Sequence, residues 1–173
     1  MRILMMAGCA ALIGLITMSG ATAQDPWRAI ATLTTSDGKA AGVAELTELE
    51  AGVLVTVQLY GLTPGEHAVH IHESGACMPD FAAAGGHFEP GSKGHGFASE
   101  TGPHAGDLPN IYVGVDGGAV ADFLNQRITL AKGPDSLFDD DGAAMIVHRN
   151  ADTYGQDAAA GPRVACGVIN PQF

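Results

Sequence analysis

Six of the seven histidines in this chain lie in three short groups, at spacings that suit metal ligands. The groups are His70 with His72, then His87, His95 and His104 followed by Asp107, and last His148 alone. Imidazole nitrogen is a good ligand for copper and zinc, and a carboxylate oxygen among imidazoles is typical of zinc. These donors are enough for two first-row transition metals, so the sequence predicts metal chemistry.

The pair His70 and His72 is expected on one face of a β-strand. Residues two apart in a strand point to the same side, so Ile71 between them would face the core. Taken alone, such a pair more often means two solvated histidines on a barrel exterior. His148 ends the apolar run 144–147 and supplies a third imidazole. Three imidazoles leave room for one further ligand, and copper(II) favours sites rich in nitrogen.

The second group lies within 21 residues of a glycine-rich stretch. Its three histidines and Asp107 offer three nitrogens and one oxygen, which is the donor set of a closed, structural zinc site. A closed site would hold the loop in shape and perform no chemistry itself. The alternative is a polar loop that holds its histidines by chance, which the density of donors disfavours.

The first 23 residues have the pattern of a secretory signal peptide. Arg2 gives a positive start, residues 3–18 are apolar except for Thr17, and Ala21-Thr22-Ala23 is a cleavage site. The apolar run is short for a membrane span. We therefore expect a signal peptide at residues 1–23 and one domain at residues 24–173, in the periplasm or secreted, with no membrane association after cleavage.

Charge and cysteine content restrict the partners and the compartment. The formal net charge of -11 opposes binding to nucleic acid or anionic lipid through the bulk field. Removal of the signal peptide takes Cys9 away and leaves Cys77 and Cys166. Two cysteines in an exported chain predict one disulfide, the alternative being two buried free thiols.

Short β-type segments between turns predict an all-β sandwich or barrel, without a long amphipathic helix. The expected strands are residues 27–34, 40–47, 53–60, 67–72, 111–115, 120–123, 127–130, 143–148 and 164–169. Two stretches, 73–107 and 149–162, lack this pattern, and an ordered loop as long as the first is usually functional. His67 lies outside the three groups, and we expect it to be structural or exposed.

Together these motifs resemble those of the copper/zinc superoxide dismutases over essentially all of residues 24–173. The matching runs are His70-Ile71-His72-Glu73, Gly85-Gly86-His87-Phe88, His95-Gly96, residues 103–108 from Pro103 to Leu108, Ile146-Val147-His148, and residues 163–168 from Arg163 to Val168. The resemblance implies an eight-stranded Greek-key β-barrel of immunoglobulin-like sandwich architecture. A long metal-binding loop and a shorter active-site loop would complete this fold.

The resemblance also implies one copper and one zinc ion per chain. Copper would be held by His70, His72, His87 and His148, and zinc by His87, His95, His104 and Asp107. His87 would be shared as a bridging imidazolate and would take part in catalysis. The reaction would be the disproportionation of superoxide to dioxygen and hydrogen peroxide.

Four further residues gain roles from the resemblance. Asp152 would link His70 to His95 from outside the two ligand sets, and such partners orient imidazoles. Arg163 would lie beside the copper and attract the anionic substrate. Cys77 would pair with Cys166 and attach the metal-binding loop to the barrel.

Two other functions compete with this enzyme. A metal-binding module without turnover, such as a metallochaperone or buffer, would be expected to lack a copper ligand or the arginine, whereas His148 and Arg163 are present. A copper-only enzyme is disfavoured by His95, His104 and Asp107. Compared with the eukaryotic cytosolic branch of the family that the chain resembles, the stretch 149–162 is short and weakly charged. Together with the signal peptide, this resemblance implies a bacterial periplasmic relative, and the subunit arrangement stays open between a monomer and a homodimer.

Overall fold

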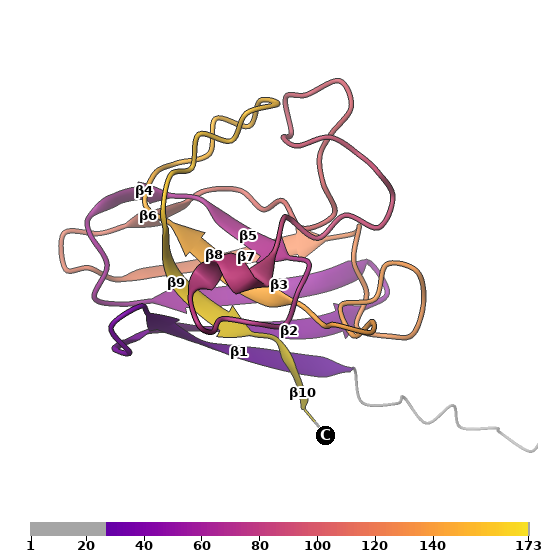
Figure 1. Ribbon diagram of the computed structural model, residues 1–173, viewed down its shortest axis with the longest axis horizontal. Coiled ribbons are helices and arrows are strands. Elements are labelled where there is room, and N and C mark those ends of the chain that lie inside the picture. Colours follow the sequence, from indigo (N-terminus) through magenta and orange to yellow (C-terminus); the bar gives the residue numbers. More distant parts are fainter. Residues whose placement is uncertain (1–26, 173) are drawn as a thin grey trace, which may run out of the picture.

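The computed structural model describes residues 27–172, so the predicted signal peptide lies outside the described residues. The described part is almost entirely β-structure (Figure 1). Its elements are β1 (Arg28–Thr35), β2 (Ala40–Leu49), β3 (Gly52–Leu59), β4 (Gly65–His67), β5 (Val69–His72), the short 3-10 helix η1 (Phe81–Ala84), β6 (Ile111–Val113), β7 (Ala119–Asn125), β8 (Ala144–His148), β9 (Arg163–Val168) and β10 (Asn170–Gln172).

The strands form one curled antiparallel barrel. The main sheet has the order β5-β8-β9-β1-β2-β3-β7, with β10 paired to β1, and β4 pairs with β6 in a second, two-stranded sheet. Only Ala68 separates β4 from β5, and β6 contacts β7, so the small sheet closes the gap between the two edges of the large one. This arrangement confirms the all-β barrel that the sequence predicts and the Greek-key form that the resemblance implies.

Alternating side chains build the core of the barrel. In β3, Val53, Val55, Val57 and Leu59 are buried, while the residues between them are more exposed. Successive residues of a strand point to opposite faces, so every second side chain of β3 enters the interior. Burying one such side chain stabilises the fold by about 1.5–3 kcal/mol relative to leaving it exposed.

The predicted strand at residues 127–130 is wrong. Thr129 forms only an isolated bridge with Ser136. Side chains take up the backbone donors here: the amide of Arg127 donates to Asn125 Oδ1 at 2.9 Å, and the amide of Leu130 donates to Glu48 Oε2 at 2.5 Å. Because these amides already have side-chain partners, the segment does not extend a sheet.

Two other local features differ from the predictions. The expected strand at residues 67–72 is interrupted at Ala68, whose amide donates to the carbonyl of Asn150 at 2.8 Å. The helix η1 was not predicted, and its first turn is capped by Asp80, whose carboxylate accepts from the amide of Ala82 at 2.9 Å. Both differences depend on local side-chain or long-range bonds that a hydrophobic pattern does not contain.

Two long stretches lie outside the main strands, residues 73–110, which include η1, and residues 149–162. In Figure 1, part of the loop after η1 and the stretch 149–162 both rise at the top of the view. They touch each other, because the amide of Ala98 donates to the carbonyl of Tyr154 at 2.7 Å. The candidate site therefore lies where two loops meet the ends of β5, β8 and β9. Within residues 27–172, no helix is long and apolar enough to cross a membrane.

Candidate metal centre

The strand β5 carries the first two histidines of the site. All four of its residues are buried, and His70 and His72 are 0% and 1% exposed. Pairing with β8 covers one edge of β5, and isolated bridges from His70 to Asp107 and from His72 to His87 cover the other. The two histidines are therefore not solvated on an exterior, which removes that alternative.

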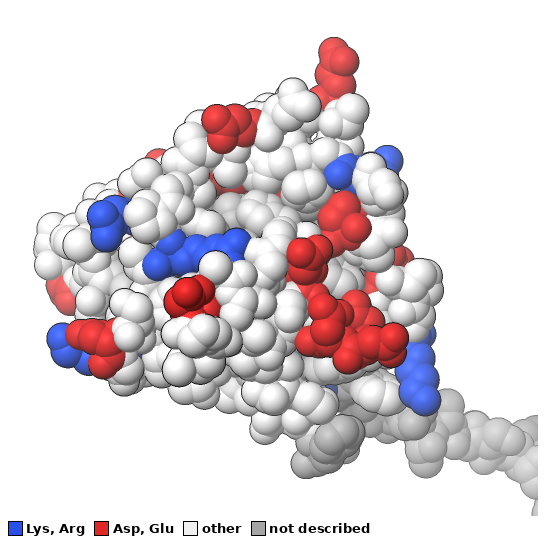
Figure 2. All heavy atoms as spheres, viewed as in Figure 1, with Lys and Arg blue, Asp and Glu red and all other residues white. Residues whose placement is uncertain are grey.

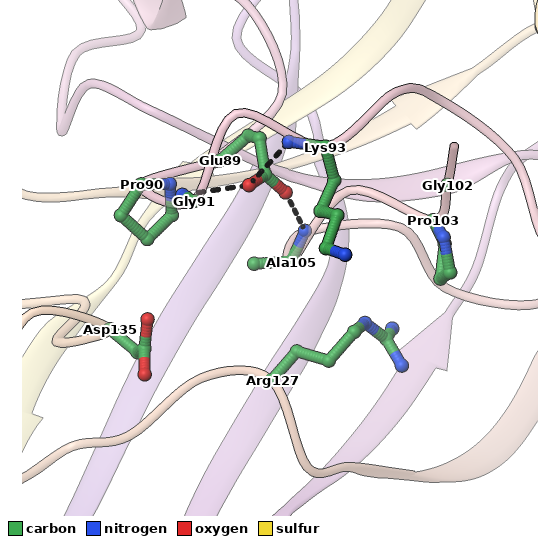
Figure 3. Close-up of a pocket in the computed structure, with 9 residues that line it drawn as sticks. All are labelled: Glu89, Pro90, Gly91, Lys93, Gly102, Pro103, Ala105, Arg127 and Asp135. Carbon is green, nitrogen blue, oxygen red and sulfur yellow. Dashed lines mark hydrogen bonds between the residues drawn. The ribbon is translucent and has the colours of Figure 1, made fainter.

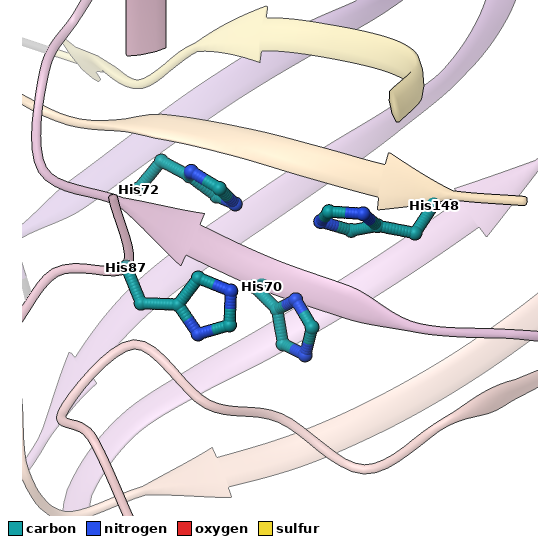
Figure 4. A group of neighbouring side chains, drawn as sticks. All are labelled: His70, His72, His87 and His148. Atoms are coloured by element: carbon teal, nitrogen blue, oxygen red, sulfur yellow. The ribbon is translucent and has the colours of Figure 1, made fainter. Parts of the chain in front are cut away.

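His70, His72, His87 and His148 bring four ligand atoms within 4.8 Å of one another (Figure 4). In three of these rings one nitrogen is held: His70 Nε2 lies 2.7 Å from Asp152 Oδ2, His72 Nδ1 lies 3.0 Å from the carbonyl of Gly85, and His148 Nδ1 lies 3.1 Å from that of Gly161. The other nitrogens of these rings, His70 Nδ1, His72 Nε2 and His148 Nε2, are buried without a hydrogen-bond partner. A buried polar atom without a partner costs about 1–3 kcal/mol, so these nitrogens fit a bound metal cation.

The second group gathers around Asp107, which is 1% exposed. Its Oδ1 lies 2.7 Å from His87 Nδ1, 3.7 Å from His95 Nε2 and 3.6 Å from His104 Nδ1. Its Oδ2 accepts the amides of Gly96 at 2.9 Å and His104 at 3.0 Å. The four residues that the sequence assigns to zinc are therefore neighbours around one carboxylate.

A four-donor group that includes Asp107 differs from the predicted one by a single residue. Donor atoms of His70, His87, His95 and Asp107 lie within 4.8 Å of one another, so His70 appears there in place of His104. The ring of His70 is 4.0 Å from that of His87, whereas the ring of His104 is 5.4 Å away. His104 Nδ1 is nevertheless buried without a hydrogen-bond partner, so it remains an available donor beside Asp107.

Asp152 connects the two groups. Its Oδ2 lies 2.7 Å from His70 Nε2 and 2.9 Å from His95 Nε2, and the residue is 5% exposed. Burial alone would raise the pKa of this carboxyl, but the hydrogen bonds from His70 and from the amide of Tyr154 outweigh it and lower the pKa. A charged carboxylate is thus held between one ring of each group.

The environment keeps the donors in the protonation state that metals require. Burial lowers the pKa of His72 to about 2 and that of His148 to about 4, and it also lowers the pKa of His70 and of His104. Burial would raise the pKa of Asp107, but bonds from His87 and Gly96 lower it to about 2. Neutral imidazoles and ionised carboxylates are the forms that bind metals.

Arg163, the first residue of β9, lies beside these histidines. It is paired with His148 across β8 and β9. Its guanidinium donates to the carbonyl of Phe81 and, at 2.5 Å, to that of Gly85, which also faces His72 Nδ1. On the face drawn in Figure 2, acidic side chains gather on one side, and basic ones are few and scattered. Arg163 is therefore a cation that two backbone carbonyls hold in place, in a chain whose net charge is negative.

The predicted disulfide is confirmed. Cys77 and Cys166 are joined, with Cα atoms 5.9 Å apart and a sequence separation of 89. Cys166 lies on β9 three residues after Arg163, and Cys77 lies in the segment that carries Phe81 and Gly85. The bond therefore fixes the strand of the arginine to the segment whose carbonyls hold it.

Two residues near the group around Asp107 were not predicted to have a role there. Arg127 donates to the carbonyls of His104 at 3.2 Å and Asp107 at 2.7 Å, and it lines a cavity of about 290 Å³ (Figure 3). Across this cavity, Glu89 accepts the amides of Gly91, Lys93 and Ala105. No sequence spacing links Arg127 or Glu89 to the site, because the side chain of each binds backbone atoms of other residues, which every residue type has.

His67 is structural, one of the two roles expected for it. It is 2% exposed, and its ring nitrogens lie 2.6 Å from the carbonyl of His148 and 2.8 Å from that of Thr63. The ring therefore supports the end of β8 at the backbone of His148.

An antiparallel barrel with buried histidine rings around two adjacent points, and carboxylates beside them, defines a protein built for two metal ions. The family model described as copper/zinc superoxide dismutase (SODC) matches residues 40–169. Since this is well over half of the chain, the chain belongs to the copper/zinc superoxide dismutase family.

Individual relatives agree with this membership. A Cu-Zn superoxide dismutase 2 of Aquifex aeolicus is 44% identical over 91% of this chain and 95% of its own length. A Cu-Zn superoxide dismutase of Caulobacter vibrioides is 43% identical over 82% of this chain and 84% of its own. The solved structure of a SOD-like protein from Bacillus subtilis has a TM-score of 0.77 and 38% identity, covering 80% of this chain and 96% of that one. The family uses copper and zinc, and both histidine groups of this chain fit metal sites.

Proposed function

We propose that this chain disproportionates superoxide to dioxygen and hydrogen peroxide at a copper ion held by His70, His72, His87 and His148. One observation carries the proposal: three of these rings keep a buried nitrogen without a partner, while a carboxylate or carbonyl fixes the opposite nitrogen. Such a rigid set of imidazoles suits a metal that changes oxidation state. A pure metal store needs neither this rigidity nor a cation beside the site.

The same proposal assigns zinc to His87, His95, His104 and Asp107. The Nε2 atom of His70 is occupied by Asp152, so only its Nδ1 is free, and one nitrogen serves one metal. If Nδ1 of His70 binds copper, the free Nδ1 of His104 supplies the fourth zinc donor. His95, whose Nε2 is held by Asp152, would offer Nδ1 and would have to give up its contact with the carbonyl of Gly155. Three nitrogens and one carboxylate oxygen are the expected set for structural zinc.

Copper, when bound, would supply one-electron chemistry between two oxidation states, while His87 and solvent would supply the two protons that each hydrogen peroxide takes up and the chain would supply the orientation. His87 lies between the two groups, with Nδ1 2.7 Å from Asp107 Oδ1. We assign Nε2 of this ring as the atom that holds a proton and delivers it to the reduced substrate, while the zinc side keeps the ring in place. Asp152 keeps His70 in one tautomer, because its oxygen accepts from Nε2.

Arg163 attracts and orients the anionic substrate in this proposal. Its guanidinium is fixed by the carbonyls of Phe81 and Gly85 and lies on the strand next to His148. A fixed cation at the mouth of a site raises the local concentration of a small anion.

The proposal extends to the location of the protein. Residues 1–23 would direct export and be removed, so that the domain of residues 24–173 works in the periplasm or outside the cell. The disulfide supports an oxidising compartment, and bacterial relatives of the same family support export. Mass spectrometry of the secreted chain should find Gln24 at its N-terminus.

A reciprocal pair of variants tests the ligand assignment. His148→Ala should lose copper and superoxide-consuming activity but keep zinc, and His104→Ala should lose zinc first and keep copper. Metal content per chain and superoxide consumption are measured on all three proteins. Wild-type protein that binds both metals without consuming superoxide would favour the metal-binding module, and full activity of His148→Ala with copper bound would contradict the ligand set.

A further inference from the structure

Tyr154 joins its own segment, residues 152–154, to two other segments around the metal centre. Its amide donates to Asp152 Oδ1 at 2.6 Å, and its carbonyl accepts from the amide of Ala98 at 2.7 Å. Its phenol oxygen accepts from the amide of Asn110 at 2.8 Å. The ring packs edge-to-face against Phe97, with centroids 5.7 Å apart. One side chain and its backbone thus join residues 152, 98 and 110, which the chain brings together from distant positions.

Asn110 in turn holds the backbone of Asp152 from both sides. Its Nδ2 donates to the carbonyl of Asp152 at 3.0 Å, and its Oδ1 accepts from the amide of Asp152 at 2.8 Å. The hydroxyl of Tyr154, Asn110 and Asp152 therefore form a closed ring of hydrogen bonds. Within this ring, the hydroxyl of Tyr154 fixes the main chain of Asn110, and the side chain of Asn110 fixes the main chain of Asp152.

The backbone of Tyr154 adopts a conformation that most side chains avoid. Its φ is +62°, in the left-handed region, which costs a non-glycine residue about 1–2 kcal/mol. This turn directs the carbonyls of Tyr154 and Gly155 towards the glycine-rich segment, where that of Gly155 lies 2.7 Å from His95 Nδ1. A Cβ atom at Gly96 would clash with both carbonyls, so a glycine is required at that point of contact.

We infer that Tyr154 is a positioning residue for the metal centre, acting through Asn110 on the carboxylate of Asp152. That carboxylate lies between His70 Nε2 and His95 Nε2, so its placement sets how the copper side and the zinc side are aligned. The inference rests on the proposed function for the assignment of these rings to metals. The strained backbone and three hydrogen bonds at one residue support a role in alignment rather than in packing alone.

The variant Tyr154→Phe removes one oxygen atom and keeps the ring on Phe97. In the copper- and zinc-loaded protein, release of zinc to a chelator should become faster by about 3- to 10-fold, as the loss of one hydrogen bond predicts. Cobalt(II) placed in the zinc site should show a shifted visible spectrum, because the His95 ring changes its orientation. The matched controls are Tyr60→Phe and Tyr112→Phe, whose side chains are exposed, and both should match the wild type.

A double-mutant cycle tests whether the effect passes through Asn110. In the Asn110→Ala background the Asp152 backbone is already free, so adding Tyr154→Phe should change zinc release much less than it does in the wild type. Additive effects, or a Tyr154→Phe rate and spectrum equal to those of Tyr112→Phe, would overturn the inference. If Asn110→Ala does not fold, the single variant against its two controls still decides. Wild-type protein that binds neither metal would instead refute the proposed function.

Discussion

His72 lies opposite His87 in an isolated antiparallel bridge that joins the end of β5 to the glycine-rich segment. Next to it, the carbonyl of Ile71 accepts from the amide of Phe88 at 2.9 Å, and the amide of Ile71 donates to the carbonyl of Gly106 at 2.9 Å. The loop therefore borders β5 like an additional strand. Ligands from a long irregular segment gain the rigidity of a sheet at this point.

This close contact predicts a strong effect of Gly106→Ala. A Cβ atom at Gly106 would clash with the carbonyl of Ile71, and backbone on both sides leaves no easy relief. We expect the free energy of unfolding to fall by about 1–3 kcal/mol, with weaker zinc retention. Gly133→Ala is the matched control, because a Cβ there meets nothing within 4 Å. Equal denaturation midpoints for the two variants would contradict the prediction.

Asp107→Asn should weaken zinc binding while leaving copper in place. The change keeps the shape of the side chain but removes the charge around which His87, His95 and His104 gather. Zinc affinity measured by chelator competition should fall at least about tenfold, as for loss of a closely held metal partner. Asp140→Asn, an exposed acid outside the site, serves as the control and should not change zinc affinity.

Removal of the disulfide should affect both stability and activity. Replacing Cys77 and Cys166 by serine releases a long loop in the unfolded chain, which the chain-entropy model values at about 4–5 kcal/mol. Activity should also fall with both metals bound, because the carbonyls of Phe81 and Gly85 no longer hold Arg163 firmly. The measurements are denaturant unfolding and superoxide consumption at matched metal content. A lower free energy of unfolding with an unchanged rate of superoxide consumption would show that the disulfide does not help to position Arg163.

Much of the fold was predictable because its signals are local. The alternation of Val53, Val55 and Val57 in β3, the turn residues Asp37-Gly38 after β1, and the spacing of the histidine pair on β5 can all be read from the sequence. The segment 127–130 failed because its apolar residues suit a strand, while Asn125 and Glu48 take up its amides. A pattern of side-chain types does not contain such bonds.

The candidate site, like the fold, could be predicted from the sequence only in part. The sequence identifies the donors through residue type and spacing, and the structure brings them together in two groups. The structural roles of Asn110, Arg127 and Tyr154 were not predictable, because each acts on the backbone of a residue distant in sequence. Nor does spacing predict that His70 lies closer than His104 to the ring of His87.

The stability of the metal-free protein should fall as the pH is lowered from about 6.5 to 4. Burial lowers the pKa of His148 to about 4 and that of His72 to about 2, from the ordinary histidine pKa of 6.5. Between these pH values the histidines bind protons in the unfolded chain but stay neutral in the folded chain. Each of them therefore lowers the free energy of unfolding by up to about 1.4 kcal/mol for each pH unit of acidification.

Denaturant unfolding of the metal-free protein at several pH values measures this slope. His148→Asn should show a shallower slope than the wild type, because one of the contributing groups is gone. A free energy of unfolding that stays constant, or increases, between pH 6.5 and 4 would refute the assignment of buried, neutral histidines.

Arg163 should raise the rate at which the substrate reaches the site. The whole chain has a net charge of -11, and the proposed substrate is a small anion. Long-range repulsion slows the encounter unless local positive charge overcomes it. Steering of this kind gains about 10–10³ in association rate in general, and this family is a standard example of it. Arg163→Ala should therefore lower the second-order rate while keeping both metals, Arg163→Glu should lower it further, and Arg163→Lys should restore part of it. Lys132→Ala, at an exposed lysine, is the control.

Added salt screens charges beyond about 8–10 Å, so it should slow the wild type and slow the glutamate variant less, or speed it up. Equal rates for wild type, alanine and glutamate variants at low salt would exclude a guiding role for Arg163.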